Sequence, residues 1–126
     1  MQHILVVGAG GALGAVARYA VTVAALRIFG PAFPWGTLAV NVVGSFLMGV
    51  LAAALLARAP DAMGLRLFLL TGVLGGFTTF SAFSLDAVNL VERGAGGLAF
   101  VYVVGSVILS IAACMGGLAF ARTLTA

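Results

Sequence analysis

The chain has very little charge. Charged residues make up 7% of its 126 residues, and the acids are limited to Asp61, Asp86 and Glu92. The basic residues are six scattered arginines, without a single lysine. Soluble domains carry roughly 25% charged residues, and nucleic-acid-binding surfaces need clustered basic side chains. The composition therefore excludes an ordinary soluble domain and gives no support to nucleic-acid binding.

Cysteine is also scarce. Cys114 is the only one and lies in an apolar run, so an intrachain disulfide and a cysteine-based metal cluster are excluded. We interpret it as a small apolar packing residue. The sequence offers no activated nucleophile, no pair of catalytic carboxylates and no cluster of metal ligands. We therefore do not expect an enzyme.

What the chain has in abundance is apolar sequence, at 63% of its residues. Four apolar stretches cover about residues 4–29, 35–57, 66–90 and 97–121. Each exceeds the roughly 20 residues that a helix needs to cross a bilayer. Membrane sequence continues after the first stretch, which argues against a cleaved signal peptide. We predict an all-α, multi-pass protein of the inner (plasma) membrane, with one four-span domain over residues 1–126.

The third stretch contains an unusual segment. Residues 75–84 read Gly-Gly-Phe-Thr-Thr-Phe-Ser-Ala-Phe-Ser. We expect residues 75–78 to break the third helix near its middle. In hydrocarbon every backbone polar group needs a partner, so a broken helix occurs where it is buried in protein or lines a wet cavity. Such discontinuous spans commonly form ion or solute sites, which indicates transport of something small.

The N-terminus looks like a nucleotide-binding loop, with glycines at positions 8, 10, 11 and 14. A dinucleotide-binding fold would need an acid about 20 residues further on. The first carboxylate in the chain is Asp61. We interpret Gly10 and Gly14 instead as a small-residue face that lets helices approach closely.

Polar side chains recur in the other spans. Asn41 lies in the second, and Tyr102, Ser106 and Ser110 form one helical stripe in the fourth. Arg18 and Asp86 are the charges well inside the spans, and intramembrane charges are functional candidates. Each polar group taken singly is also consistent with interhelical packing. Together with the third span, they predict a polar track.

The chemistry of this track favours a small anion. Amide and hydroxyl groups donate hydrogen bonds, and aromatic rings have a positive edge. Phe80 and Phe83 share one helix face. Small proton-coupled multidrug or cation antiporters use a carboxylate in the first span, which this chain lacks, but such an antiporter remains the alternative. A non-transporting helical assembly subunit is a third possibility.

The arginines are divided evenly between the two sides of the membrane. The expected spans place Arg58, Arg66 and Arg122 on one side and Arg18, Arg27 and Arg93 on the other. The positive-inside rule then has little bias to act on. We predict insertion in both orientations. Because no internal repeat is visible in so short a chain, two antiparallel copies would supply the symmetry that transporters use.

Three stretches carry a resemblance to a known family. They are residues 14–19 (Gly-Ala-Val-Ala-Arg-Tyr), residues 35–41 (Trp-Gly-Thr-Leu-Ala-Val-Asn) and residues 71–84. In these motifs, and in length and span order, the chain resembles the dual-topology fluoride channels of the Fluc or CrcB family. The resemblance implies an antiparallel homodimer with two fluoride pores, which exports cytoplasmic fluoride passively, and a structural sodium ion at the centre of the interface.

The resemblance also implies roles for individual residues. Phe80 and Phe83 would turn their ring edges toward fluoride, and the backbone carbonyls of Gly75 and Thr78 would hold sodium. Arg18 would lie by an aqueous vestibule. The sequence departs from the family motif at Ala82, where threonine is common. The full set expected along the fluoride pathway is Arg18, Asn41, Thr79, Phe80, Ser81, Phe83, Tyr102, Ser106 and Ser110.

Overall fold

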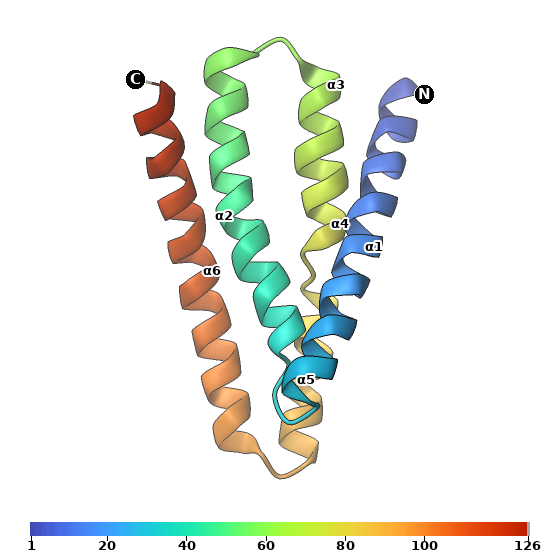
Figure 1. The fold of residues 1–126 in the computed structure, drawn as a ribbon, viewed down its shortest axis with the longest axis vertical. Coiled ribbons are helices and arrows are strands. Elements are labelled where there is room, and N and C mark those ends of the chain that lie inside the picture. Colours follow the sequence, from blue (N-terminus) through green and yellow to red (C-terminus); the bar gives the residue numbers. More distant parts are fainter. Residues whose placement is uncertain (126) are drawn as a thin grey trace.

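The computed structural model describes residues 1–125, and its regular elements are all helical (Figure 1). Four candidate membrane spans cover Gln2–Phe29, Trp35–Arg58, Met63–Glu92 and Gly96–Thr125, which confirms the predicted all-helical, four-span organisation. The elements in chain order are α1 (Gln2–Phe29), α2 (Trp35–Arg58), α3 (Met63–Arg66), the π-helical segment η1 (Leu67–Leu74), α4 (Gly75–Phe77), α5 (Ser81–Glu92) and α6 (Gly96–Thr125).

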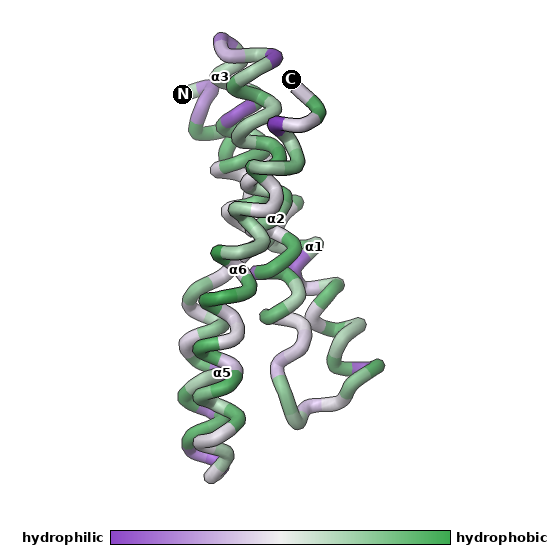
Figure 2. The backbone as a smooth tube through the Cα atoms, turned by 90° about the vertical axis from the view of Figure 1, so that its left-hand side faces the viewer, coloured by the Kyte–Doolittle hydropathy of each residue, from purple (hydrophilic) through white to green (hydrophobic). Residues whose placement is uncertain are grey.

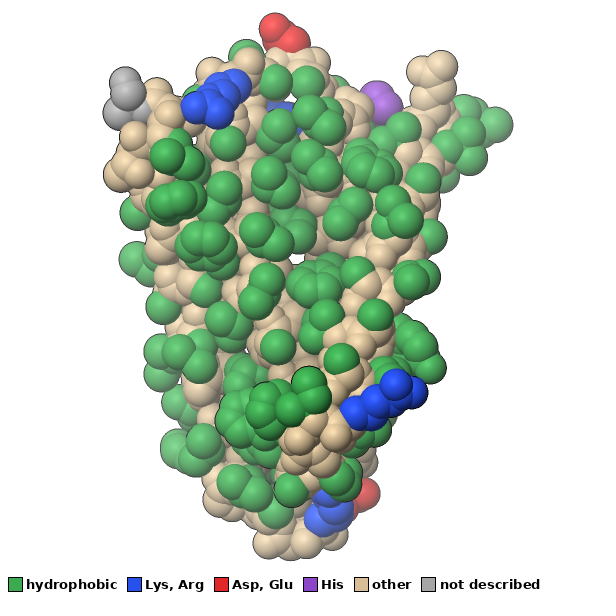
Figure 3. Space-filling view, in the orientation of Figure 1, with side chains coloured by type: hydrophobic (Ala, Val, Ile, Leu, Met, Phe, Trp, Pro, Cys, Tyr) green, Lys and Arg blue, Asp and Glu red, His purple; other side chains and the backbone are tan. Residues whose placement is uncertain are grey.

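The surface of this chain suits a lipid environment. Green, hydrophobic stretches run along the helices in Figure 2, and charged side chains on the face in Figure 3 lie mostly towards the two ends. Large apolar side chains such as Leu5, Val16 and Ile108 are 72%, 68% and 60% exposed. A continuous apolar exterior of this kind marks a surface for membrane or partner.

Both chain ends and the α2–α3 connection lie at one end of the molecule (Figure 1). The α1–α2 and α5–α6 connections lie at the other. Gly30 and Gly94 follow α1 and α5 with φ of 77°, a left-handed conformation that glycine adopts without steric cost and that commonly ends helices. The ends and connections therefore lie on the sides that were assumed above, where the arginines are divided evenly between the two sides of the membrane.

The third span changes neighbours along its length. Its first part, η1 and α4, packs mainly against α1, whereas α5 packs against α6. Helix α2 packs chiefly against α6. The change occurs between Phe77 and Ser81, where the backbone leaves the helical conformation.

This irregular segment lies slightly later than expected. Gly75 is within ordinary helical geometry (φ −63°, ψ −37°), and a Cβ added there would meet nothing closer than 3.7 Å. Thr78 is the first extended residue, with φ −82° and ψ 158°. Residues 78–80 therefore lie outside the helices, whereas residues 75–77 of the expected break are helical, and the glycine pair is not what ends α4.

Glycines instead bring α1 against the third span, as Gly10 and Gly14 predicted. A Cβ at Gly14 would collide with the carbonyl oxygen of Val73, and one at Gly76 with the carbonyl oxygen of Gly11. The two backbones therefore touch through small residues, as in other closely packed membrane helices.

We predict that Gly14→Ala destabilises the protein, because the new methyl group would overlap the backbone of η1. Overpacking of this kind costs about 1–3 kcal/mol. Thermal unfolding in detergent checks it. Gly8→Ala on the same helix is the matched control, since a Cβ there has no neighbour within 4 Å. Equal melting temperatures for the two variants would contradict the close approach.

Candidate functional site

Asn41 of α2 binds the non-helical segment of the third span at two points. Its side-chain Nδ2 donates to the carbonyl oxygen of Thr79 at 2.9 Å, and its Oδ1 accepts the Thr79 N–H at 2.8 Å. One side chain thus satisfies both backbone polar groups of a residue that has left the helix. In a continuous helix the Thr79 N–H would bond the carbonyl oxygen of Gly75, four residues earlier.

A second backbone donor is diverted three residues later. The Ala82 N–H donates to the Thr79 hydroxyl oxygen at 3.2 Å, whereas a continuous helix would direct it to the carbonyl oxygen of Thr78. The carbonyls of Gly75 and Thr78 therefore both lose their usual helical donor. These are the two carbonyls expected to hold a cation.

A cavity of about 450 Å³ lies beside this segment. We call it the Asn41 cavity; it is lined by Asn41, Gly44, Ser45, Met48, Gly75, Thr78, Thr79, Phe80, Phe83, Ser106, Val107, Ser110 and Cys114. None of these lining residues, all within the described chain, is charged. Amide, hydroxyl, thiol and aromatic groups supply its polarity. Cys114 is thus at a cavity wall, in addition to packing between helices.

Among the side chains that line the Asn41 cavity, Ser106 has a buried hydroxyl group without a hydrogen-bond partner in the described part of the chain. The residue is 5% exposed. Leaving a buried hydroxyl unpaired costs about 1–3 kcal/mol. A buried polar group left unpaired by the protein is a candidate for pairing with a water molecule or an ion.

Phe80 and Phe83 lie side by side, with ring centroids 5.5 Å apart. Their surroundings differ. Phe83 is 8% exposed and belongs to a core cluster with Leu90, Ala99 and Tyr102, so it fills the core as well as lining the cavity. Phe80 is 77% exposed and lies on the surface of the chain.

Tyr102 lies next to the cavity but not in its wall. It is 1% exposed, and its hydroxyl donates to Oδ2 of Asp86 at 3.1 Å. Its ring packs on Phe83 at 5.2 Å. The expected stripe of three hydroxyl groups on α6 is therefore divided, because Ser106 and Ser110 face the Asn41 cavity and Tyr102 faces Asp86.

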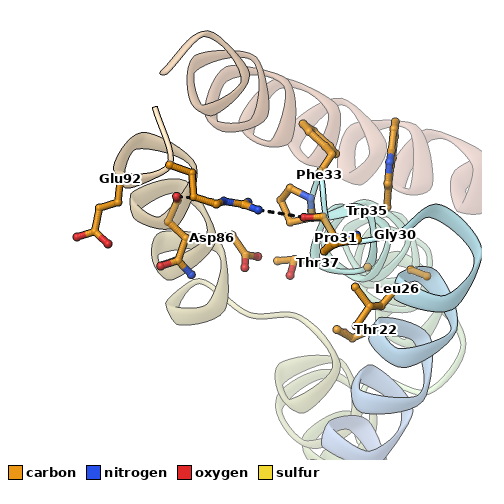
Figure 4. Close-up of a pocket in the computed structure, with 14 residues that line it drawn as sticks. Thr22, Leu26, Gly30, Pro31, Phe33, Trp35, Thr37, Asp86 and Glu92 are labelled. Carbon is orange, nitrogen blue, oxygen red and sulfur yellow. Dashed lines mark hydrogen bonds between the residues drawn. The ribbon is translucent and has the colours of Figure 1, made fainter. Parts of the chain in front are cut away.

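Asp86 lines a second cavity of about 640 Å³ near the α1–α2 connection (Figure 4). In this Asp86 cavity, Thr37 and Asp86 lie near each other and Glu92 is turned away from them. Arg93 Nη1 donates to the Pro31 carbonyl at 3.3 Å. Sequence reasoning missed Thr37, although its position one helical turn before Asn41 was a usable signal.

The structure therefore brings together part of the expected set. Three of the nine expected residues do not line the Asn41 cavity. Tyr102 faces Asp86, Arg18 is half-buried on α1, and Ser81 shares a 3.3 Å hydrogen bond with the Thr79 hydroxyl. The members that do line it are Asn41, Thr79, Phe80, Phe83, Ser106 and Ser110.

Comparison with known proteins finds full-length relatives. A family described as CrcB-like protein, Camphor Resistance (CrcB), matches residues 5–118. A "Fluoride-specific ion channel FluC" of Agrobacterium fabrum is 57% identical over 124 residues, covering 98% of this chain and 99% of the relative. A protein of the same name from Cereibacter sphaeroides is 60% identical over 122 residues, covering 97% and 96%. Another, from Rhizobium meliloti, is 56% identical over 124 residues, covering 98% and 99%.

We predict that Asn41→Asp lowers stability, because a carboxylate oxygen would replace the amide group that donates to the Thr79 carbonyl. Breaking such a pair costs about 1–3 kcal/mol. Thermal unfolding of the purified protein measures it. Ser45→Ala, one turn further along α2 on the same cavity, serves as the control. An Asn41→Asp variant as stable as Ser45→Ala would show that the Thr79 contact holds nothing in place.

Proposed function

The chain belongs to the CrcB family, and we propose that it forms a fluoride-specific ion channel through which cytoplasmic fluoride leaves the cell passively. It is a multi-pass protein of the inner membrane. Passive conduction of an ion requires no catalytic chemistry, and we propose no enzymatic activity for this chain.

The observation that carries this proposal is the unpaired Ser106 hydroxyl beside an uncharged cavity of hydrogen-bond donors. A permeating ion must exchange its hydration shell for groups of the protein. The serine hydroxyl hydrogens and the second N–H of the Asn41 amide supply donors to an anion, since the first N–H bonds the Thr79 carbonyl. The ring edges of Phe80 and Phe83 add positive potential without a fixed charge. Such a lining can bind fluoride and also release it.

A proton-coupled cation antiporter fits this cavity less well. Proton-coupled antiport needs a group within the span that gains and releases a proton, commonly a carboxylate, and no carboxylate is among the residues that line the Asn41 cavity. Asp86 lines the other cavity and accepts a hydrogen bond from Tyr102. A non-transporting assembly subunit, in which polar residues only pack helices together, would not explain the unpaired Ser106 hydroxyl.

We propose that two copies assemble in antiparallel orientation to form two pores. Phe80 supports this, because a phenyl ring 77% exposed lines a cavity that its own protomer leaves incomplete. Arg58, Arg66 and Arg122 at one end balance Arg27, Arg93 and Arg18 towards the other, which leaves little bias in orientation.

A structural sodium ion is the third part of the proposal. Sodium is a hard cation that takes oxygen ligands. The carbonyls of Gly75 and Thr78 have lost their helical donors to Asn41 and to the Thr79 hydroxyl. Two copies meeting at this segment would supply the two carbonyls twice, around one ion.

We predict that reconstituted protein releases fluoride, but not chloride, from liposomes. Phe80→Ile and Phe83→Ile keep apolar bulk and remove the positive ring edge. Each should lower fluoride flux roughly tenfold, which corresponds to about 1.4 kcal/mol of lost ion stabilisation. Flux is measured per folded dimer with a fluoride electrode.

Phe120→Ile is the matched control for these variants. Phe120 pairs with Phe46 between α6 and α2 at 6.2 Å, away from both cavities. Its flux should equal that of the unsubstituted protein. Full flux in Phe80→Ile and Phe83→Ile would remove the rings from the pathway, and absence of fluoride efflux from the unsubstituted protein would refute the channel itself.

We also predict that removing sodium weakens the dimer. A ligand present at about 100 times its dissociation constant stabilises a folded state by about 2.7 kcal/mol. Replacing sodium with a large organic cation should therefore lower the melting temperature and release monomers, as measured by unfolding and light scattering. Replacement of chloride by another inert anion is the control. A dimer equally stable without sodium would argue against the ion.

A further inference from the structure

The connection between α1 and α2 sends one aromatic side chain into the core. Phe33 lies outside any helix, yet its half-buried ring packs against the cluster of Phe83, Leu90, Ala99 and Tyr102. Trp35, two residues later, is 45% exposed, and the centroids of the Phe33 and Trp35 rings are 4.7 Å apart. Phe33 thus joins an aromatic group at the molecular surface to the buried cluster.

The contact of Phe33 in that cluster is with Tyr102. Their centroids are 5.5 Å apart at an interplanar angle of 89°, the edge-to-face arrangement that aromatic pairs favour. Tyr102 also packs on the pore residue Phe83 and donates its hydroxyl to Asp86. Because the hydroxyl is rigidly attached to the ring, whatever places the ring also aims the hydroxyl.

The connection that carries Phe33 is restrained at two points. The Phe33 carbonyl oxygen accepts the Trp35 N–H at 2.9 Å, within a connection that contains Pro31 and Pro34. Proline fixes φ and removes freedom from such a segment. Arg93 at the end of α5 donates to the Pro31 carbonyl. In Figure 4 Phe33 projects from this connection and Trp35 from the start of α2, both beside the Asp86 cavity.

From these contacts we propose that Phe33 is a positioning residue for permeation. It holds the Tyr102 ring so that the hydroxyl reaches Asp86 and the ring stays against Phe83. The proposal rests on the proposed channel function. It assigns to the α1–α2 connection a part in the ion pathway, although Phe33 itself does not line the Asn41 cavity.

The first test is a pair of flux measurements. Phe33→Leu should lower fluoride flux by up to about tenfold, since one misplaced hydrogen bond is worth about 0.5–1.5 kcal/mol, and Phe33→Tyr, which keeps the ring, should restore it. In a Tyr102→Leu background, which removes both the ring and the hydroxyl, Phe33→Leu should have little further effect. Equal losses in both backgrounds would overturn the proposal, because Phe33 would then act without Tyr102.

Phe29→Leu is the matched control. Phe29 contacts the same Trp35 ring at 5.6 Å, and its only ring partner among the described residues is Trp35. Loss of an aromatic group from the surface cluster alone should leave fluoride flux unchanged. A loss in Phe29→Leu equal to that in Phe33→Leu would assign the effect to the cluster as a whole and overturn the specific role.

A second measurement does not depend on flux. The chain has two tyrosines, so Tyr19→Phe leaves Tyr102 as the sole carbon-13 signal of a tyrosine-labelled sample. Phe33→Leu should move that signal beyond the change expected from losing the Phe33 ring current, whereas Phe33→Tyr, which keeps the ring, and Phe29→Leu should leave it in place. If the unsubstituted protein carried no fluoride, the channel proposal would fail while this shift still tested the positioning. An unmoved signal would overturn it.

Discussion

The pairing between the Asn41 amide and the backbone of Thr79 is the interaction on which the rest of the site depends. A helix that leaves its regular path in hydrocarbon exposes an N–H and a carbonyl that water cannot satisfy. Asn41 satisfies both at 2.8 and 2.9 Å. Once it has done so, the Gly75 carbonyl is left without its helical donor, and the third span is free to change direction.

That change of direction explains where the cavities lie. Before the irregular segment, the third span is held against α1 by backbone contacts at glycines such as Gly14 and Gly76. After it, α5 turns to α6, where Phe83 and Tyr102 meet. The Asn41 cavity lies at the point of transfer, and the Asp86 cavity lies beyond it towards the α1–α2 connection. Close packing on one side of the segment thus coexists with accessible polar space on the other.

Much of this could be predicted from sequence, and the reasons are local. Span length and apolar content identify four membrane helices, and Gly10 and Gly14 correctly predict a close helix approach. The hydrogen-bond partners of the polar side chains could not be predicted, because they depend on which helices pack against each other. Asn41 was expected to donate to an ion, but one of its N–H groups already bonds Thr79. Tyr102 was grouped with Ser106 by periodicity, yet it bonds Asp86. The glycine pair suggested a break at residues 75–78, whereas Gly76 packs against the α1 backbone and the irregular residues follow at 78–80.

The most direct measurement is a high-resolution electron-microscopy map of the purified protein in lipid nanodiscs with sodium fluoride. We expect an antiparallel dimer in which the third helix is interrupted at residues 78–80. The Asn41 amide should lie within hydrogen-bonding distance of the Thr79 N–H and carbonyl, and each Phe80 should be covered by the partner copy. A continuous third helix, or an Asn41 side chain without contact to Thr79, would contradict this account.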